Sequence, residues 1–269
     1  MKLSEIYEIL NGHAEKSLSD EYCARFHAYD NSGILVDCGE EIHGVLFTLD
    51  LTNAAIDEAL QVGANLIVTH HPVIYGKIGD IRVDDSALLG GKLVKCLRNG
   101  ISVVSMHLNL DVAQEGIDES LMEGVCLAAG GKASDIVEKM HSLENGAYGR
   151  SYQVQEISLA SLVAKAKEVF NTNRILFYGK DEKTISRVAS FCGSGGDEAG
   201  VAFAQKTGAD VIISSDFKHH VITRAVESGL AVIALTHYAS ENYGFEKYYK
   251  KIRQQVGIPC VYHTDENLL

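Results

Sequence analysis

Apolar runs rich in β-forming residues alternate with segments of helical periodicity along most of the chain. The runs are GVLFTL (44–49), NLIVT (65–69) and ISVVSM (101–106), followed after about residue 185 by DVIISS (210–215) and LAVIALTH (230–237). The segments between them read as helices, one of them near 86–98. Strands and helices that alternate in this way are typical of βαβ units, so the pattern predicts an α/β fold with mostly parallel or mixed sheets.

The second part of the chain repeats the pattern of the first. The segment 63–68 (GANLIV) corresponds to 208–213 (GADVII), and 100–104 (GISVV) corresponds to 229–233 (GLAVI). We therefore expect a duplication: two similar α/β halves that face each other within one compact unit. The predicted division is a first half with an N-terminal helix (1–130), a connecting edge segment (131–184) and a second half (185–269).

Charge and hydropathy narrow the range of partners. The formal net charge is −12 at pH 7, which repels phosphate backbones, so duplex nucleic acid is an unlikely ligand. An anionic small molecule would need local positive charge from a metal ion or from basic side chains. No apolar run approaches the roughly 20 residues that span a bilayer, and the N-terminus reads as an amphipathic helix. We expect a cytoplasmic protein without a membrane partner, whose 6 scattered cysteines are reduced and mostly buried.

Polar clusters follow three of the apolar runs at the point where each predicted strand ends. His70 and His71 follow NLIVT, the segment from His107 to Asp111 follows ISVVSM, and the segment from His237 to Glu241 follows LAVIAL. Ligands of parallel sheets gather at the carboxyl ends of the strands, so we expect one shared site. If the chain turns helical after His107 and His237, the residues four positions apart lie on one helix face.

Each cluster has a simpler interpretation when taken alone. An isolated pair of histidines is usually a surface or core pair, and Asp111 and Ser240 are common residues at helix N-termini. Three such clusters at strand ends favour a metal site, because mixed imidazole and carboxylate ligands suit Zn²⁺, Fe²⁺, Mn²⁺, Co²⁺ or Ni²⁺. The segment Gly193–Gly196 before a predicted helix allows either a phosphate contact or merely close packing.

A family resemblance rests on these same segments. The chain resembles the Nif-three-like family, whose members are often described as GTP cyclohydrolase 1 type 2 homologs. The matching segments are YDNSGILV (29–36), Gly63-Ala64 before VTHHP (68–72), His107 through Asp111, Asp216 to His220, and Thr236-His237 with Glu241. The similarity extends to about residue 250, and it indicates the short form of the family, without the inserted middle domain of about 100 residues.

The resemblance implies a dinuclear metal site between the two halves. Its ligands would be His70, His71, Asp111, His237 and Glu241, with Glu241 as the bridge between two divalent ions. The same resemblance would make His107, Asp216 and His220 pocket residues that orient ligands or carry protons. It also implies a toroidal homohexamer.

Two classes of function are compatible with such a site. The first is a metal-dependent hydrolase acting on a nucleotide-like substrate, in which metal-activated water attacks a polarised carbon or phosphorus. The resemblance implies the guanine ring of GTP as substrate, whereas a phosphoesterase would need the same metals and the same cleft. The second class is a metal-binding or metal-delivery protein without turnover of its own.

Overall fold

The computed structural model describes residues 1–83, 88–132 and 136–269, and the chain forms two compact units. Unit 1 contains Met1–Ala113 and Phe245–Thr264, and unit 2 contains Gln114–Gly244 and Asp265–Leu269. This division differs from the predicted boundaries at residues 130 and 184. The reason is that the segment expected to connect the halves supplies strands to the sheet of unit 2, while the chain returns to unit 1 near its C-terminus.

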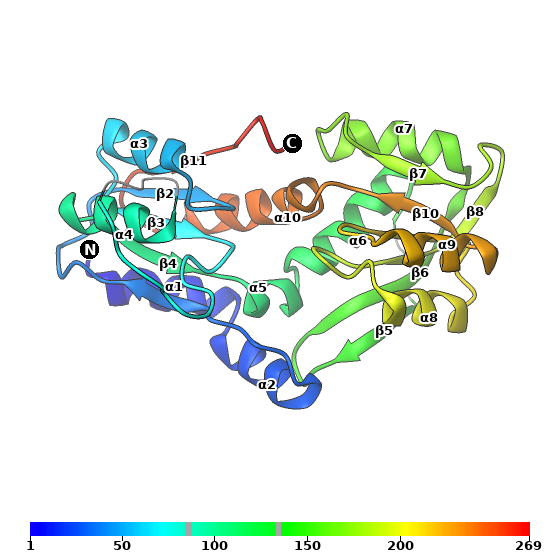
Figure 1. The fold of residues 1–269 in the computed structure, drawn as a ribbon, viewed down its shortest axis with the longest axis horizontal. Coiled ribbons are helices and arrows are strands. Elements are labelled where there is room, and N and C mark those ends of the chain that lie inside the picture. Colours follow the sequence, from blue (N-terminus) through cyan, green and yellow to red (C-terminus); the bar gives the residue numbers. More distant parts are fainter. Residues whose placement is uncertain (84–87, 133–135) are drawn as a thin grey trace. The chain divides into compact units, whose positions relative to one another are not determined.

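Unit 1 is built on a five-stranded sheet with the order β1-β4-β3-β2-β11 (Figure 1). Strands β11, β2, β3 and β4 are parallel, and β1 pairs with β4 in the antiparallel direction. The elements of this unit are α1 (Leu3–His13), α2 (Lys16–Phe26), β1 (Gly33–Val36), β2 (Val45–Thr48), α3 (Asn53–Val62), β3 (Leu66–Thr69), α4 (Leu89–Arg98), β4 (Ser102–Ser105), α5 (Leu108–Val112) and β11 (Cys260–Tyr262).

Unit 2 is built on a six-stranded sheet with the order β5-β6-β8-β9-β10-β7. Strands β8, β9 and β10 are parallel, and the others pair in the antiparallel direction. The elements are α6 (Ile117–Ala128), β5 (Val137–Ser142), β6 (Ala147–Ser158), α7 (Leu159–Val169), β7 (Leu176–Tyr178), β8 (Thr184–Ser190), α8 (Glu198–Lys206), β9 (Val211–Ser214), α9 (His219–Glu227) and β10 (Ala231–Ala234). Helix α10 (His237–Ile252) begins in unit 2 and ends in unit 1.

Four strands of each sheet share one topology, which confirms the predicted duplication. In unit 1 the chain runs from an antiparallel edge strand, β1, through the parallel strands β2, β3 and β4. In unit 2 it runs in the same way from β7 through β8, β9 and β10. One local contact is also repeated: Asn65 before β3 and Asp210 before β9 each accept hydrogen bonds from backbone N–H groups just before or within the neighbouring strand. The predicted α/β class with mixed sheets is therefore confirmed.

Helices around the parallel strands follow the sequence signals for their ends. Thr52 caps α3 by accepting a hydrogen bond from the Ala55 N–H, and Gly63 ends that helix with a φ of +72°. The capping hydroxyl satisfies an N–H that the helix itself leaves unpaired, and glycine adopts the left-handed conformation at little cost. The helix predicted near 86–98 is α4, which begins at Leu89, and the predicted residues 86 and 87 lie outside the described residues.

Candidate metal centre

The imidazoles of unit 1 are brought together by the register of two parallel strands. Thr69, the last residue of β3, pairs with Ser105, the last residue of β4. The residues that follow, His70 and His71 in one strand and His107 in the other, therefore leave the sheet side by side at its carboxyl edge. The hydroxyls of Thr69 and Ser105 lie 2.7 Å apart, and both lie within hydrogen-bonding distance of the His71 carbonyl oxygen. These contacts hold the turn that carries both histidines.

His70, His71 and His107 form one cluster of nitrogen donors. Each offers a ring nitrogen, and these atoms all lie within 4.8 Å of one another. The ring centroid of His70 is 4.9 Å from that of His71 and 5.2 Å from that of His107. Three imidazoles at this spacing match the usual number of protein ligands around a catalytic zinc ion. Unit 1 alone thus contains a group of side chains that could hold a metal ion.

An oxygen atom faces Nδ1 of each imidazole in this cluster. His70 Nδ1 lies 2.7 Å from the Met106 carbonyl oxygen. His71 Nδ1 lies 2.8 Å from Asp50 Oδ1, and His107 Nδ1 lies 2.7 Å from Asp30 Oδ1. Because neither a carbonyl nor a carboxylate oxygen can donate, Nδ1 carries the hydrogen and Nε2 of the neutral ring carries the lone pair. Metal-binding histidines are typically oriented by this arrangement.

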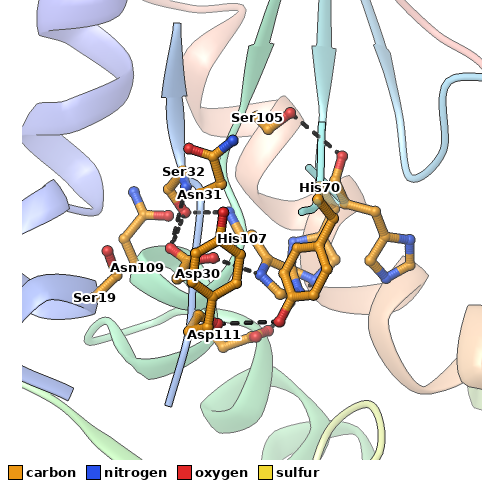
Figure 2. A network of polar contacts seen from close by, with 12 residues as sticks. Ser19, Asp30, Asn31, Ser32, His70, Ser105, His107, Asn109 and Asp111 are labelled. Atoms are coloured by element: carbon orange, nitrogen blue, oxygen red, sulfur yellow. Dashed lines mark hydrogen bonds and ion pairs between the residues drawn. The ribbon is translucent and has the colours of Figure 1, made fainter. Parts of the chain in front are cut away.

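Asp30, the carboxylate beside His107, is itself hydrogen-bonded to two side chains. Figure 2 shows its carboxylate joined to both His107 and Ser32, and the Ser32 hydroxyl donates to Asp30 Oδ2 over 2.6 Å. Burial by itself would raise the pKa of Asp30, but the hydrogen bonds from His107 and Ser32 hold that pKa well below its ordinary value of 3.8. Asp30 is therefore an anion at neutral pH, and it favours the tautomer of His107 with the hydrogen on Nδ1.

Asp111 adds a carboxylate to the imidazoles of unit 1. It lies on the short helix α5, four residues after His107, and its backbone N–H donates to the His107 carbonyl oxygen. Its Oδ1 is 3.4 Å from His70 Nε2, the nitrogen that carries the lone pair. The helical turn expected after His107 therefore forms, and it brings a carboxylate to the imidazole cluster.

Unit 2 contains a second pair of candidate ligands at the start of α10. His237 Nε2 lies 3.1 Å from Glu241 Oε1, as expected for residues four apart on a helix. His237 Nδ1 lies 2.5 Å from Asp216 Oδ2, so this fourth imidazole also has an oxygen at Nδ1. Asp216, which the family resemblance implies as a pocket residue, thus lies beside a candidate ligand. His220 is an exposed residue of α9, and its Nε2 lies 3.8 Å from Glu198 Oε1.

The glycine-rich segment before α8 packs against this pair. Gly193 has a φ of +55°, and a Cβ atom there would lie 2.5 Å from Glu241 Oε1. The Gly193 N–H donates to the Ser240 hydroxyl, and its carbonyl oxygen accepts from Ser215. Of the two interpretations that the sequence allows, these contacts agree with close packing, because both polar groups of the Gly193 backbone are used within the protein.

Two residues of the centre are absent from the sequence-based prediction of the site. Asp50 follows β2 by two residues, at the same edge of the sheet as His71, so its position after the apolar run 44–49 is a signal that could have identified it. Asp30 lies before β1, an antiparallel strand, and the rule about carboxyl ends of parallel strands does not apply to it. Its contact with His107 depends on the pairing of β1 with β4.

The donor set of both units fits a divalent transition metal. Neutral imidazole nitrogens and carboxylate oxygens suit Zn²⁺, Mn²⁺, Fe²⁺, Co²⁺ and Ni²⁺. None of the cysteines belongs to the donor groups found among the described residues, and all six are free thiols. Cys96, Cys126 and Cys192 are buried, while the other three are half-buried. Within the described ranges, no helix is long and apolar enough to cross a bilayer.

Comparison with known proteins identifies relatives over nearly the whole chain. A GTP cyclohydrolase 1 type 2 homolog from Clostridium acetobutylicum is 30% identical over 243 residues, which is 90% of this chain and 85% of that protein. The Protein NIF3 homolog of Schizosaccharomyces pombe is 27% identical over 80% of this chain and 78% of its own. These are the names of the relatives, and they match the family that the sequence motifs indicate.

Solved structures show the same fold. The Staphylococcus aureus hypothetical protein SA1388 superimposes with a TM-score of 0.82 at 22% identity, covering 98% of this chain and 97% of that one. Reduced HcgD from Methanocaldococcus jannaschii gives a TM-score of 0.78 at 24% identity, covering 97% of both chains. The family model of Duf34/NIF3 (NGG1p interacting factor 3) matches residues 1–267. The chain therefore belongs to the Duf34/NIF3 family.

Proposed function

We propose that this protein is a metal-dependent hydrolase that holds two divalent ions and acts on a nucleotide-like substrate. The ligands we propose are His70, His71, Asp111, His237 and Glu241, with Glu241 bridging the ions. The observation that carries the proposal is shared by the three histidines of this set: each has an oxygen at Nδ1, so each offers the lone pair of Nε2 as a ligand. The names of the relatives support the nucleotide-like substrate.

The chemistry proposed for the centre needs both the ions and the groups around them. Divalent ions supply Lewis acidity and lower the pKa of water, which provides a nucleophile at neutral pH. Asp50, Asp30 and Asp216 keep the hydrogens of their histidine partners on Nδ1, so that Nε2 stays available as a ligand.

Metal content is the direct test of the proposal. Protein purified without chelator, or loaded with Zn²⁺ or Mn²⁺, should contain close to two ions per chain by elemental analysis. The substitution His71→Ala should lower that number. His263→Ala is a matched control, because His263 Nδ1 also pairs with a carboxylate, Glu58 Oε2 at 2.6 Å, but the residue is outside the candidate ligand groups of the described chain. Equal metal contents in the two variants would contradict the proposal.

The roles of Glu241 and His107 can be separated by the same measurement. Glu241→Gln keeps the shape of the side chain but removes the charge that a bridging carboxylate contributes to both ions, so at least one ion should be lost. His107→Ala should retain both ions if His107 only orients ligands or carries protons. The proximity of His107 to His70 and His71 makes the opposite result informative, because loss of an ion in His107→Ala would make this residue a ligand itself.

Turnover distinguishes the enzyme from a metal-delivery protein. Metal-loaded protein should convert at least one compound of a nucleotide panel, and His71→Ala should abolish that conversion. A protein that retains its ions and converts no compound would favour metal delivery.

His220 and Asp216 remain proposed proton carriers, and the activity of His220→Ala tests the role of His220. The predicted homohexamer is tested by light scattering, where a mass of one or two chains would exclude it.

A further inference from the structure

A cavity of about 560 Å³ lies at the carboxyl edge of the sheet in unit 2. Its walls come from the residues that follow β9 and β10, and from the start of β7. Strand β7 is antiparallel to β10, with Leu176 opposite Ala234, so the first residue of β7 reaches the same edge. In sheets of this kind, ligands bind outside the carboxyl ends of the parallel strands. The cavity therefore has the position and the size of a small-molecule site.

Most of the lining is apolar, and it includes two aromatic rings. Leu176 and Tyr178 contribute from β7, and Leu235 contributes from the end of β10. Phe217 lines the cavity and also packs against Gly196, where a Cβ atom would lie 2.8 Å from the Phe217 Cγ atom. This close packing holds the Phe217 ring in place. Aromatic rings beside apolar side chains suit a flat ring of a ligand, because heteroaromatic bases stack on aromatic side chains.

Asp216 connects the cavity to the candidate metal ligands of unit 2. It lines the cavity, and its Oδ2 atom pairs with His237 Nδ1. Its other carboxylate oxygen, Oδ1, has no hydrogen-bond partner within the part of the chain that the structure describes. Asp216 also has a φ of +56°, a conformation that costs energy outside glycine and is concentrated at functional sites. Oδ1 can therefore accept a hydrogen bond from an N–H group of a ligand.

Arg174 supplies positive charge to the same cavity. Its guanidinium group donates to the Asn267 carbonyl oxygen, which uses one of its five N–H donors. In a chain with a net charge of −12, an anionic ligand needs such a local cation. A guanidinium group pairs well with phosphate or carboxylate oxygens.

We propose that this cavity binds a heteroaromatic ligand that carries a phosphate group, with the ring between apolar and aromatic side chains. In this arrangement Arg174 pairs with the phosphate, Tyr178 contacts the ring, and Asp216 Oδ1 accepts a hydrogen bond from it. The inference deepens the proposed function, because Asp216 would join the ring to the histidine that we propose as a metal ligand. It names the residues that recognise the substrate, whereas the proposed function concerns the residues that hold the ions.

The test measures nucleotide binding to the full chain after its metal has been removed with a chelator. The affinities are measured by isothermal titration calorimetry, first with GTP and ATP. The same titration is then made with guanosine, which lacks the phosphates, and with inorganic triphosphate, which lacks the ring. Arg174→Gln and Tyr178→Leu are the test variants. Arg98→Gln, an exposed arginine of unit 1, and Phe177→Leu are the controls. Phe177 lies between two cavity residues on β7 but does not line the cavity, as expected for alternating side chains.

We expect GTP or ATP to bind, and Arg174→Gln and Tyr178→Leu each to weaken that binding about tenfold, since charged hydrogen bonds and ring stacking contribute energies of that order. Arg174→Gln should weaken triphosphate binding but not guanosine binding, and Tyr178→Leu should do the reverse. Absence of nucleotide binding at millimolar concentration would overturn the proposal, as would equal affinities in test and control variants. Because metal is absent, this result is independent of the metal analysis above.

Discussion

The carboxylate of Asp30 lies 2.7 Å from Nδ1 of His107, although 77 residues separate the two in the chain. The contact forms because Asp30 precedes β1 and His107 follows β4, and these strands are paired, with Gly33 opposite Ser105. Asp50 holds His71 in a similar way from the end of β2, the neighbour of β3. Strand pairing thus brings an acceptor to each of these two imidazoles of the candidate metal centre.

We predict that Asp30→Asn weakens metal binding about 10- to 100-fold, which is the usual effect of removing a group that supports the metal ligands without binding the metal itself. The amide has no negative charge, and it can turn its NH₂ group toward His107 and so favour the wrong tautomer. The measurement is competition with a chelator of known affinity. Asp37→Asn is the control, because Asp37 is an exposed aspartate after the same strand. Equal metal affinities of the two variants would show that Asp30 has no part in metal binding.

Gly193→Ala tests the packing beside Glu241. The new Cβ atom would lie 2.5 Å from Glu241 Oε1, so the carboxylate must move, and metal content should fall. Gly208→Ala is a matched control, because Gly208 has a similar positive φ, +69° against +55°, but open space around the Cβ position. Both variants should lose about 1 kcal/mol of stability from backbone strain. Only Gly193→Ala should lose metal, and a similar loss in Gly208→Ala would attribute the effect to general destabilisation.

Arg150→Met is predicted to destabilise unit 2 by about 3 to 5 kcal/mol, the usual cost of leaving a buried charge without its partner. Arg150 and Asp118 form a buried ion pair, and Asp118 also accepts hydrogen bonds from the N–H groups of Gly149 and Cys192. Urea unfolding measures the change. Arg187→Met is the control, because its partner Glu138 is about half exposed, and exposed pairs contribute about 0 to 1 kcal/mol. Equal losses in both variants would contradict this account.

The fold could be predicted from the sequence because the central strands are buried on both faces. Residues 66–69 and 211–214 are buried throughout, so their apolar runs stand out against the helices between them. The hydrogen bonds of Asp30 and Asp50 to their histidines do not follow from these apolar runs, since they depend on which strands are neighbours. The two halves also differ in the position of the histidine after the strand. By strand register His107 corresponds to Thr236, so the motif that begins at His237 starts one residue later than the motif that begins at His107.

We predict that the free energy of unfolding decreases at high pH, because burial raises the pKa of the Cys96 and Cys126 thiols from 9.0 to about 12. A pKa that is higher in the folded state means that folding favours the protonated thiol. The resulting stabilisation is complete below about pH 9 and is lost progressively as the pH rises toward 12. The buried hydroxyls of Tyr152 and Tyr248, whose pKa values are raised well above 10.0, act in the same direction.

Alkylation with iodoacetamide at pH 8.5, followed by mass spectrometry, checks the prediction, because only the thiolate reacts. We expect Cys96 and Cys126 to remain unmodified in the folded protein and to react fully in urea. The half-buried Cys23, whose pKa is also raised by burial, should react slowly in the folded state, because its sulfur can still be reached by the reagent. Modification of Cys96 as fast as Cys23 would contradict the protection that burial gives the Cys96 thiol. The free energy of unfolding, measured separately between pH 8 and pH 10, should decrease as the pH rises, and a constant value would contradict the pH prediction.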